Sequence, residues 1–282
     1  MLKCLENDVF PAVGKRPINQ ILAPEILEMI RPIEARGALD YNKRVLQRVS
    51  MVFRYAIVTG RAEYNPSADL RGALKTRKQT HHAALARDDL PAFLKALDSY
   101  DGHLITKCGL QLIALTFLRS TELRGATWAE IDFERKEWRV PAERMKMNAE
   151  HIVPLADQAV ERLRKLHAVT GRYPYVFTGR NDPRRPMSEN TLLYALYRMG
   201  YKRKATVHGF RATASTILNE SGFNRDAIER QLAHVEGNKV RAAYHRSEYL
   251  DERRAMMDWW ADYLDRLKSD SKVVALPTTR TA

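Results

Sequence analysis

The segment from His208 to Tyr249 constrains this chain more than any other stretch, because it joins a buried helical pattern to polar residues in a fixed order. His208 and Arg211 are three residues apart, a spacing that puts two side chains on one face of a helix. The positions after them are largely apolar and predict that the helix is buried behind this face: Ala212, Ala214, Ile217 and Leu218. We therefore expect a helix that presents polar groups from a packed interior.

Two more residues of this segment can carry chemistry, His234 and, ten residues later, Tyr244. Arginine has a planar fork that matches two phosphate oxygens, and histidine exchanges a proton near neutral pH. An activated tyrosine hydroxyl can form a covalent intermediate. The ordered set fits chemistry on a phosphate. Any one of these residues, taken alone, is more often structural than catalytic, so the rest of the chain must decide.

The charge of the chain points to a polyanionic partner. Its 282 residues include 47 Lys and Arg against 34 Asp and Glu, a formal net charge of +13. Nucleic acid is the leading candidate for so basic a protein, although a merely basic surface has the same composition. The two cysteines, Cys4 and Cys108, form no disulfide or metal framework. A signal-peptide core and an apolar run of about 18 residues are both missing, which predicts a cytoplasmic protein without a membrane span.

The first part of the chain reads as helical. Residues 2–9 resemble the end of a helix that closes near Pro11 and Gly14, and further helices are expected at about 24–36 and 40–59. Pro32 predicts a kink or a break in the first of these, and Asn65-Pro66 predicts the start of a short helix. The exposed face of the 40–59 helix is entirely positive and is a candidate DNA contact, carried by Lys43, Arg44, Arg48 and Arg54.

A polar, basic stretch at 75–87 reads as an interdomain linker, in which Lys75, Arg77 and Lys78 are candidate DNA contacts. A passive connector is an equally good interpretation of this stretch alone. Helices are then expected at about 88–97 and 104–118, followed directly by Arg119, with Glu122 placed to orient its guanidinium. A surface ion pair is the alternative for these two residues.

The second part of the chain mixes strands with helices. Strands are expected at 127–133, 137–140 and 151–155, and they put Lys146 on or beside a tight turn. Helices are expected at 158–169, from a cap at Ser188 to Met199, at 226–232 and at 248–267, and the last fifteen residues look frayed. The chain should therefore be mainly α with a small antiparallel sheet.

Taken together, these features resemble the tyrosine recombinases, the phage integrase family, and in particular the integrases of satellite phages and genomic islands. The resemblance is carried by R-S-T-E-L-R-G-A-T-W, E-R-M-K-M-N-A-E-H-I-V-P-L, H-G-F-R-A-T-A-S-T and R-Q-L-A-H-V-E-G-N-K-V-R-A-A-Y-H-R. It implies a helical core-binding domain at 1–74, a linker at 75–87, a mixed α/β catalytic domain at 88–268 and a flexible tail at 269–282. It also implies strand exchange without a metal or another cofactor.

The resemblance gives bond-making roles to three residues of this chain. Tyr244 would attack a scissile phosphate and form a 3′-phosphotyrosyl link, with His208 assisting its deprotonation. Lys146 would protonate the leaving 5′-oxygen. Tyr249 is the competing nucleophile by position, but Tyr244 has the cationic neighbours Arg241, His245 and Arg246, which favour a phenolate.

The resemblance gives phosphate-holding roles to the others. Arg119 and Arg211 would bind the non-bridging oxygens, His234 would hydrogen-bond the phosphate, and Glu122 would orient its neighbours. The partners implied are double-stranded DNA attachment sites, a homotetramer on synapsed DNA, a DNA-bending protein and an excisionase. The implied location is the bacterial cytoplasm, in association with the nucleoid.

One departure from the family pattern concerns the N-terminus. Integrases of this branch carry a further N-terminal domain that binds arm sites, and this chain begins near the end of the first core-binding helix, which predicts a truncation. Three hypotheses follow. The chain is an active site-specific recombinase for integration or excision, a truncated remnant that binds DNA without productive recombination, or an enzyme with type IB topoisomerase activity.

Overall fold

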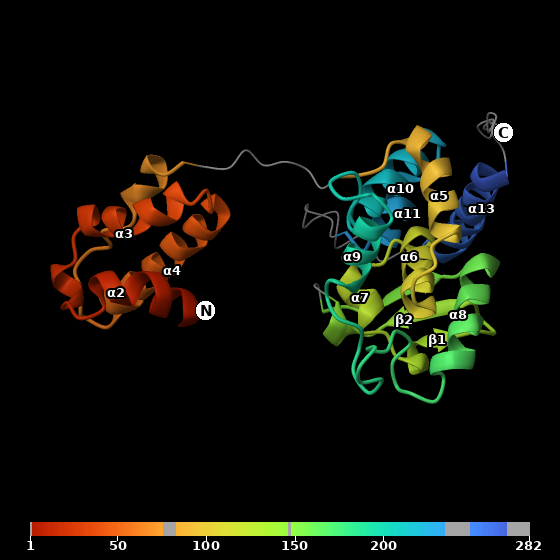
Figure 1. Cartoon of the computed structure of the whole chain (residues 1–282), viewed down its shortest axis with the longest axis horizontal. Coiled ribbons are helices and arrows are strands. Elements are labelled where there is room, and N and C mark those ends of the chain that lie inside the picture. Colours follow the sequence, from red (N-terminus) through yellow and green to blue (C-terminus); the bar gives the residue numbers. More distant parts are fainter. Residues whose placement is uncertain (1, 76–82, 146–147, 235–248, 270–282) are drawn as a thin grey trace. The chain divides into compact units, whose positions relative to one another are not determined.

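The computed structural model describes residues 2–75, 83–145, 148–234 and 249–269, and the chain divides into two compact units, residues 1–81 and 82–282. Each unit has a hydrophobic core of its own. The described parts are mostly helical, with one small antiparallel sheet, so the predicted fold class is confirmed (Figure 1). Of the helices in these ranges, none has both the length and the apolar character that a bilayer crossing requires.

The first unit consists of short helical turns around two longer helices. In chain order they are α1 (Leu2–Cys4), the π-helical turn η1 (Leu5–Val9), α2 (Phe10–Val13), the 3-10 turn η2 (Ile18–Gln20), α3 (Ala23–Ala35), α4 (Leu39–Val58) and the 3-10 turn η3 (Asp69–Ala73). Helices α3 and α4 pack together because each buries a stripe at helical spacing, such as Ile26, Ile30 and Ile33 of α3.

The first unit differs from two expectations. Helix α3 does not break at Pro32 and continues to Ala35, because Pro32 lies on the exposed side while Ile30 and Ile33 hold the helix against the core. No helix begins at Asn65 either. Its side-chain oxygen accepts hydrogen bonds from the amide and hydroxyl of Ser67, at 3.1 and 2.7 Å, which closes a local turn instead.

The second unit contains the sheet and most of the helices. In chain order its elements are η4 (Arg87–Asp89), α5 (Leu90–Asp98), α6 (Leu104–Thr116), α7 (Ser120–Arg124), η5 (Trp128–Glu130), β1 (Ile131–Asp132), β2 (Glu137–Val140), η6 (Ala142–Arg144), β3 (His151–Pro154), α8 (Asp157–Thr170), α9 (Thr191–Arg198), α10 (Gly209–Glu220), α11 (Arg225–Gln231) and α13 (Leu250–Ser269). Almost every residue of α6 is buried, so the other elements pack around it.

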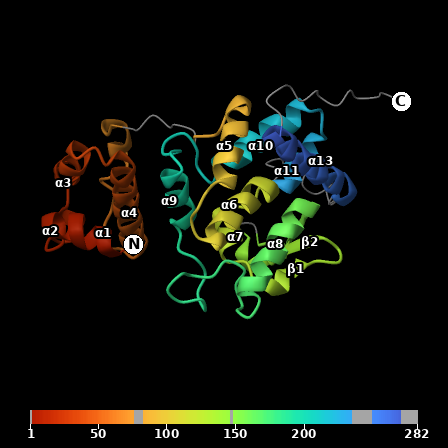
Figure 2. The ribbon, with the colours of Figure 1, turned by 45° about the vertical axis from the view of Figure 1, so that its right-hand side comes forward.

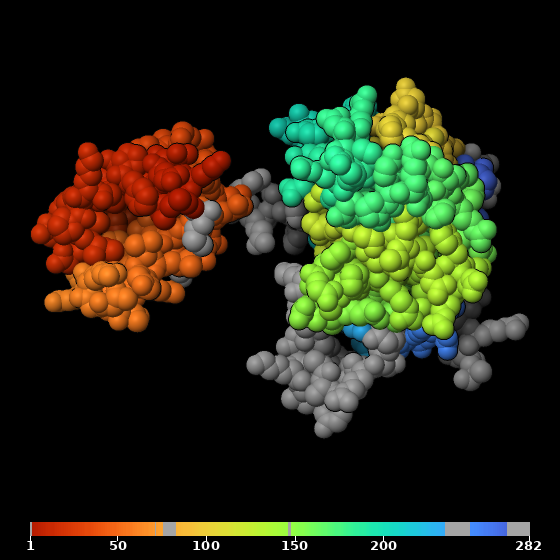
Figure 3. All heavy atoms as spheres, turned by 90° about the horizontal axis from the view of Figure 1, so that it is seen from below, coloured from red at the N-terminus to blue at the C-terminus, as the bar shows by residue number. Residues whose placement is uncertain are grey.

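Helix α6 runs through the middle of the second unit. The group α10, α11 and α13 lies on one side of it, and the sheet with α8 lies on the other (Figures 1 and 2). One face of the unit is covered mainly by the yellow-green and green segments that include the sheet, and the later helices, in blue, reach that face only at its edge (Figure 3). This arrangement brings the ends of α6 and α11 to one region.

The sheet has the order β1-β2-β3, with antiparallel pairs Ile131↔Trp138 and Val140↔His151. The expected strand at 127–133 is wrong over most of its length. The amide and hydroxyl of Thr127 both donate to Glu130 Oε1 at 3.0 Å, which folds the segment into the turn η5 and leaves only β1 as strand.

The cap predicted for α9 also differs. The residue that caps α9 is Asn190, and Ser188 lies two residues earlier, where its hydroxyl is 2.8 Å from the hydroxyl of Thr191. Helix α6 ends at Phe117, which takes a left-handed conformation with φ of 60° and so turns the chain sharply toward Arg119. Its aromatic ring packs on Trp260 of α13, at 5.3 Å between ring centroids.

Candidate active site

Arg119 is the residue immediately before α7, and Glu122 fixes it in place. The Glu122 carboxylate accepts the Arg119 backbone amide at 2.8 Å and its guanidinium at 2.6 Å. Glu122 is 2% exposed, whereas the Arg119 side chain is 23% exposed. The Arg119 guanidinium is therefore held by a buried carboxylate, while part of the side chain remains accessible to an anion.

Arg211 lies in the first turn of α10 and is buried. One Nη atom donates to the Phe117 carbonyl at the end of α6, and the other donates to the Leu232 carbonyl at the end of α11. Burial, with a smaller effect of the nearby positive charge of Arg119, lowers the pKa of Arg211 to about 10. The residue is still a cation at neutral pH.

The two arginines meet at one short stretch of backbone. Arg211 donates to the carbonyl of Leu232, and Arg119 donates to that of Ala233 at 3.1 Å. His234 is the next residue, and its Nδ1 lies 2.8 Å from the Glu229 carboxylate. Ala233 has φ of 46°, a left-handed turn that ends α11. Three of the predicted site residues, far apart in sequence, thus lie around one turn.

His208 precedes α10 as its cap residue, and its carbonyl accepts the Arg211 amide at 3.2 Å. Its side chain is exposed, while that of Arg211 is buried. Ala212 is exposed as well, contrary to the expectation that it helps to bury the helix. The buried side of α10 is formed instead by Phe210, Thr213 and the later apolar residues, because Ala212 lies one residue beyond the inward-facing Arg211.

Lys146 and Tyr244 lie outside the described residues, as do Arg77 and Lys78 of the linker and residues 270–282 of the tail. The ends of the segment that carries Lys146 are described. Strands β2 and β3 are joined by residues 141–150, as the expected strand ends imply. The connection contains the helical turn η6, and the amide of Asn148 donates to the Met145 carbonyl at 3.0 Å. Tyr249 immediately precedes α13 with φ of 46°, and its carbonyl accepts the amide of Arg253 at 2.8 Å.

Arg144 of η6 is a site residue that sequence reasoning missed. It donates to the Glu122 carbonyl at 2.5 Å and forms an ion pair with Glu130 at 3.2 Å. It therefore ties the connection carrying Lys146 to the helix that holds Arg119. Arg144 is two residues from Lys146 in the quoted motif, which is the one signal that could have singled it out.

The predicted DNA contacts of the first unit differ in exposure. Lys43 and Arg44 of α4 are exposed, whereas Arg48 is half-buried and donates to the Cys4 sulfur at 2.6 Å. The backbone amide of Lys75 donates to the Glu34 carboxylate at 2.7 Å. Among the described residues of this set, Lys43, Arg44, Arg54 and Lys75 are exposed and open to a ligand, and Arg48 is the less accessible one.

The segment that enters the second unit is fixed to the helix of Arg211. Thr206 and Thr213 donate to the carbonyls of Ala83 and Leu85, the second at 2.8 Å. Gly209 lies under this crossing, where an added Cβ would be 2.1 Å from the Ala83 oxygen. Glycine is required there because the two backbones approach so closely.

The geometry brings two arginines and a histidine together on converging helix ends, a candidate anion-binding centre. Among the described residues, no cluster of three or more His, Cys, Asp or Glu side chains suits a metal ion. Guanidinium groups held in this way can bind non-bridging oxygens of a phosphodiester with little reorganisation.

Comparison with known proteins agrees with this class. A model of the phage integrase family matches residues 83–250, and a model of the phage integrase central domain matches residues 1–73. The integrase of Enterobacteria phage P4 is 45% identical over 281 residues, which cover 94% of this chain and 64% of the phage protein. The chain belongs to the phage integrase family, which confirms the resemblance read from its motifs.

Solved structures agree in fold. A lambda integrase dimer bound to a COC′ core site superposes with a TM-score of 0.66 at 19% identity, covering 87% of each chain. A lambda integrase tetramer bound to a Holliday junction gives a TM-score of 0.66 at 20% identity, covering 84% of this chain and 71% of that one. At this identity the likeness establishes the fold alone.

Proposed function

We propose that the chain is a tyrosine-type site-specific DNA recombinase that integrates or excises a prophage or genomic island. The observation that carries this proposal is the meeting of Arg119 and Arg211 at the adjacent carbonyls of Ala233 and Leu232, immediately before His234. Two guanidiniums and an imidazole around one turn fit a single phosphodiester group. Membership of the phage integrase family supports the choice of DNA as the polymer.

In the proposed reaction the Tyr244 oxygen attacks the scissile phosphorus. The new oxygen–phosphorus bond forms the 3′-phosphotyrosyl link, and the bond from phosphorus to the 5′-oxygen breaks. His208 assists removal of the phenolic proton, and Lys146 gives a proton to the leaving 5′-oxygen. A 5′-hydroxyl of another strand then reverses these steps, which exchanges strands with no net change in bonds.

The negative charge that develops on the phosphate is the part of the barrier that the arginines lower. Arg119 and Arg211 bind the non-bridging oxygens. Their hydrogen bonds to Glu122 and to main-chain carbonyls fix the guanidiniums in position before the DNA binds. His234 donates a further hydrogen bond, oriented by Glu229. Glu122 supports this group through Arg119.

The rest of the chain serves to hold the DNA. The first unit is the core-binding domain, with Lys43 and Arg44 on the phosphate backbone, and residues 75–87 are the linker to the catalytic domain. By analogy with the lambda integrase structures bound to DNA, the working form is a homotetramer on synapsed attachment sites. A DNA-bending protein and an excisionase are the accessory partners of this proposal, and the bacterial nucleoid is its location.

A remnant that binds DNA without recombining it accounts less well for the arrangement. Binding alone needs positive charge, but it does not need a buried arginine whose two Nη atoms are anchored on separate helix ends. Type IB topoisomerase activity would use the same tyrosine chemistry, and it differs in cutting one strand without exchange between duplexes.

The test uses a nicked duplex that spans the attachment site at the edge of the element. After cleavage beside the nick, the short 5′-hydroxyl strand diffuses away and the covalent complex is trapped on a denaturing gel. Wild-type protein and Tyr249→Phe should form the adduct, while Tyr244→Phe should bind the same duplex and form none. An adduct that persists in Tyr244→Phe, or that maps to Tyr249, rejects the assignment. Recombinant product from two intact sites separates strand exchange from topoisomerase activity.

A further inference from the structure

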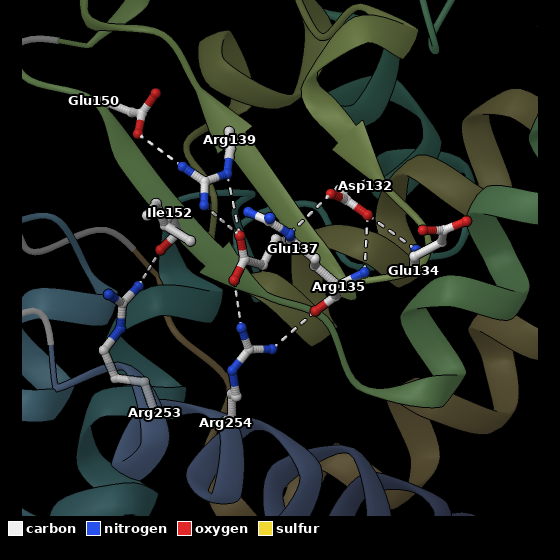
Figure 4. Close-up of polar contacts among 9 residues, drawn as sticks. All are labelled: Asp132, Glu134, Arg135, Glu137, Arg139, Glu150, Ile152, Arg253 and Arg254. Atoms are coloured by element: carbon white, nitrogen blue, oxygen red, sulfur yellow. Dashed lines mark hydrogen bonds and ion pairs between the residues drawn. The ribbon is translucent and has the colours of Figure 1, made fainter.

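Arg253, near the start of α13, is a buried cation that sequence reasoning did not identify. Its side chain is 0% exposed. Its Nε and one Nη donate to the side-chain oxygen of Gln231, at 3.0 and 2.8 Å, and the same Nη donates to the carbonyl of Ile152 in β3 (Figure 4). The guanidinium therefore joins α13 to both α11 and the sheet.

Gln231 extends this connection to α6. It is the last residue of α11, it is 1% exposed, and its side-chain nitrogen donates to the Thr116 carbonyl at 3.2 Å. Because Arg253 gives two hydrogen bonds to the amide oxygen, that oxygen faces the guanidinium and the amide nitrogen faces Thr116. Arg253 thus determines which way the Gln231 amide points.

The residues joined in this way are the immediate neighbours of the carbonyls that hold Arg211. Thr116 precedes Phe117, and Gln231 precedes Leu232, and the Arg211 guanidinium bridges the carbonyls of Phe117 and Leu232. The ends of α6 and α11 are therefore bridged twice, once by Arg211 and once by Gln231. The second bridge is completed by Arg253 from outside the site.

We propose that Arg253 is a positioning residue for the recombination reaction, which acts through Gln231 to fix the two carbonyls that hold Arg211. This role rests on the proposed function. A buried cation adds little to the free energy of unfolding, because the cost of removing the charge from water offsets much of the favourable energy of its hydrogen bonds. Its planar fork suits a geometric role, because it reaches an amide and a carbonyl at the same time, as an ammonium point charge cannot.

Arg254 provides a matched control beside it. Arg254 donates to the carbonyl of Arg135 at 2.9 Å and pairs with the Glu137 carboxylate, which also accepts Arg139 at 2.7 Å (Figure 4). It docks the same turn of α13 on the same sheet, but its hydrogen bonds go to the β1–β2 turn and to β2, not to Gln231. A loss of docking alone should therefore appear in Arg254 variants as well.

The experiment compares Arg253→Gln, Arg253→Lys, Gln231→Leu and Arg254→Gln in the full chain. For each variant we would measure the melting temperature, the affinity for the nicked attachment-site duplex, and the single-turnover rate of adduct formation at saturating protein. We expect Arg253→Gln and Gln231→Leu to lower the rate by about 10–100-fold, the usual effect of losing an orienting partner, with DNA affinity within about twofold of wild type. Arg253→Lys should recover little of the loss, and Arg254→Gln should cleave at the wild-type rate.

A double-variant comparison shows whether Arg253 acts through Arg211. Arg253→Gln added to Arg211→Lys should reduce the rate by less than about threefold further, because the anchored fork is already absent. The proposal would be overturned if the double variant lost rate by the product of the factors seen in Arg253→Gln and Arg211→Lys alone. Equal rate losses in Arg253→Gln and Arg254→Gln would also overturn it. If no variant at Arg253 or Gln231 folds, the role is structural and the proposal also fails.

Failure of the inference is distinct from failure of the proposed function. A wild-type protein that forms a Tyr244-dependent adduct, with Arg253→Gln cleaving equally fast, rejects the positioning role alone. A wild-type protein that binds the duplex and forms no adduct rejects the recombinase function, whatever the variants do.

Discussion

Glu122 binds Arg119 at two points, its backbone amide at 2.8 Å and its guanidinium at 2.6 Å. The buried carboxylate of Glu122 therefore fixes the backbone at the start of α7 and also orients the Arg119 guanidinium. The backbone bond closes the turn, and the side-chain bond sets the orientation of the Arg119 guanidinium. These two effects respond differently to substitution.

Glu122→Gln should lower the single-turnover cleavage rate by about 10–100-fold, as expected for the partner of a phosphate-binding residue. Glutamine keeps one acceptor and can hold the Arg119 amide, so the fold and the affinity for DNA should change little. The adduct assay on the nicked duplex measures the rate, and a titration with the same duplex measures affinity. A wild-type cleavage rate in Glu122→Gln would show that Arg119 is oriented by its bond to Ala233 alone.

Arg119→Ala and Arg211→Ala should each slow cleavage by about 10²–10³-fold, the range for losing one donor to the transition state. Arg211→Lys should restore little activity, because an ammonium cannot reach the carbonyls of Phe117 and Leu232 together while binding a phosphate oxygen. Arg211 is the buried member of the pair, so its alanine variant should also lower the melting temperature. Near-normal cleavage by Arg211→Ala would mean that the phosphate is held elsewhere.

Gly209→Ala should lower the free energy of unfolding of the second unit by about 1–3 kcal/mol, the usual effect of overpacking. The added methyl group would be 2.1 Å from the Ala83 oxygen, so the segment that enters the unit must move away from α10. All the tryptophans of the chain lie between residues 128 and 260, so tryptophan fluorescence during denaturation reports the second unit. Ala212→Ser adds one heavy atom at an exposed position of the same helix and should change stability by less than about 0.5 kcal/mol. Equal stability of the two variants would contradict the close approach.

His151 should make the second unit sensitive to acid. Burial, followed by the charges of Arg253, Arg230 and Arg211, lowers the pKa of His151 to about 3. The unfolded chain binds this proton near pH 6.5, so stability is lost as pH falls from that value toward 3. Between pH 7 and pH 5 this group alone should remove about 2 kcal/mol.

His151→Gln cannot take up the proton, so its loss of stability over the same interval should be smaller by that amount. Urea denaturation at pH 7 and pH 5, followed by tryptophan fluorescence, gives both differences. Parallel losses in the two proteins would show that His151 does not titrate between the folded and unfolded states.

Lys43→Ala and Arg44→Ala should weaken binding to any duplex and should each reduce the slope of log affinity against log salt by about one. Fluorescence anisotropy with Tyr244→Phe, which forms no adduct, measures this slope between low and moderate salt. Arg48→Ala should also destabilise the first unit, because Arg48 donates to the buried Cys4. Lys15→Ala, an exposed change outside the predicted contact set, is the control. An unchanged slope in both Lys43→Ala and Arg44→Ala would remove this face from the DNA footprint.

The sequence was most informative where an interaction is local or periodic. Helices α4 and α13 were predicted from the spacing of their apolar residues, and α6 from its long apolar run. The pair of Arg119 and Glu122 was visible because its members are three residues apart. The strand expected at 127–133 failed for a local reason as well. Its apolar pattern was overruled by the side-chain turn between Thr127 and Glu130.

Contacts between distant segments could not be predicted. Gln231 binds Arg253, 22 residues away, and Thr116, 115 residues away, and no spacing rule joins these positions. A glutamine at a helix end and an arginine in an amphipathic helix look ordinary in sequence. They gain a role only when packing brings the ends of α6, α11 and α13 together.

The carbonyl anchors of Arg211 have a consequence for how this site can diverge. Main-chain oxygens are present whatever the side chain is, so mutations at Leu232 or Ala233 leave the acceptors for Arg211 and Arg119 chemically unchanged. The constraint on this part of the site is therefore the path of the backbone and not the chemistry of these side chains. Phe117 and Ala233 have the least freedom, because both take a left-handed conformation that disfavours β-branched replacements, and the Phe117 ring also packs on Trp260. A side chain such as that of Leu232 can therefore be replaced while the two guanidiniums keep the same main-chain acceptors.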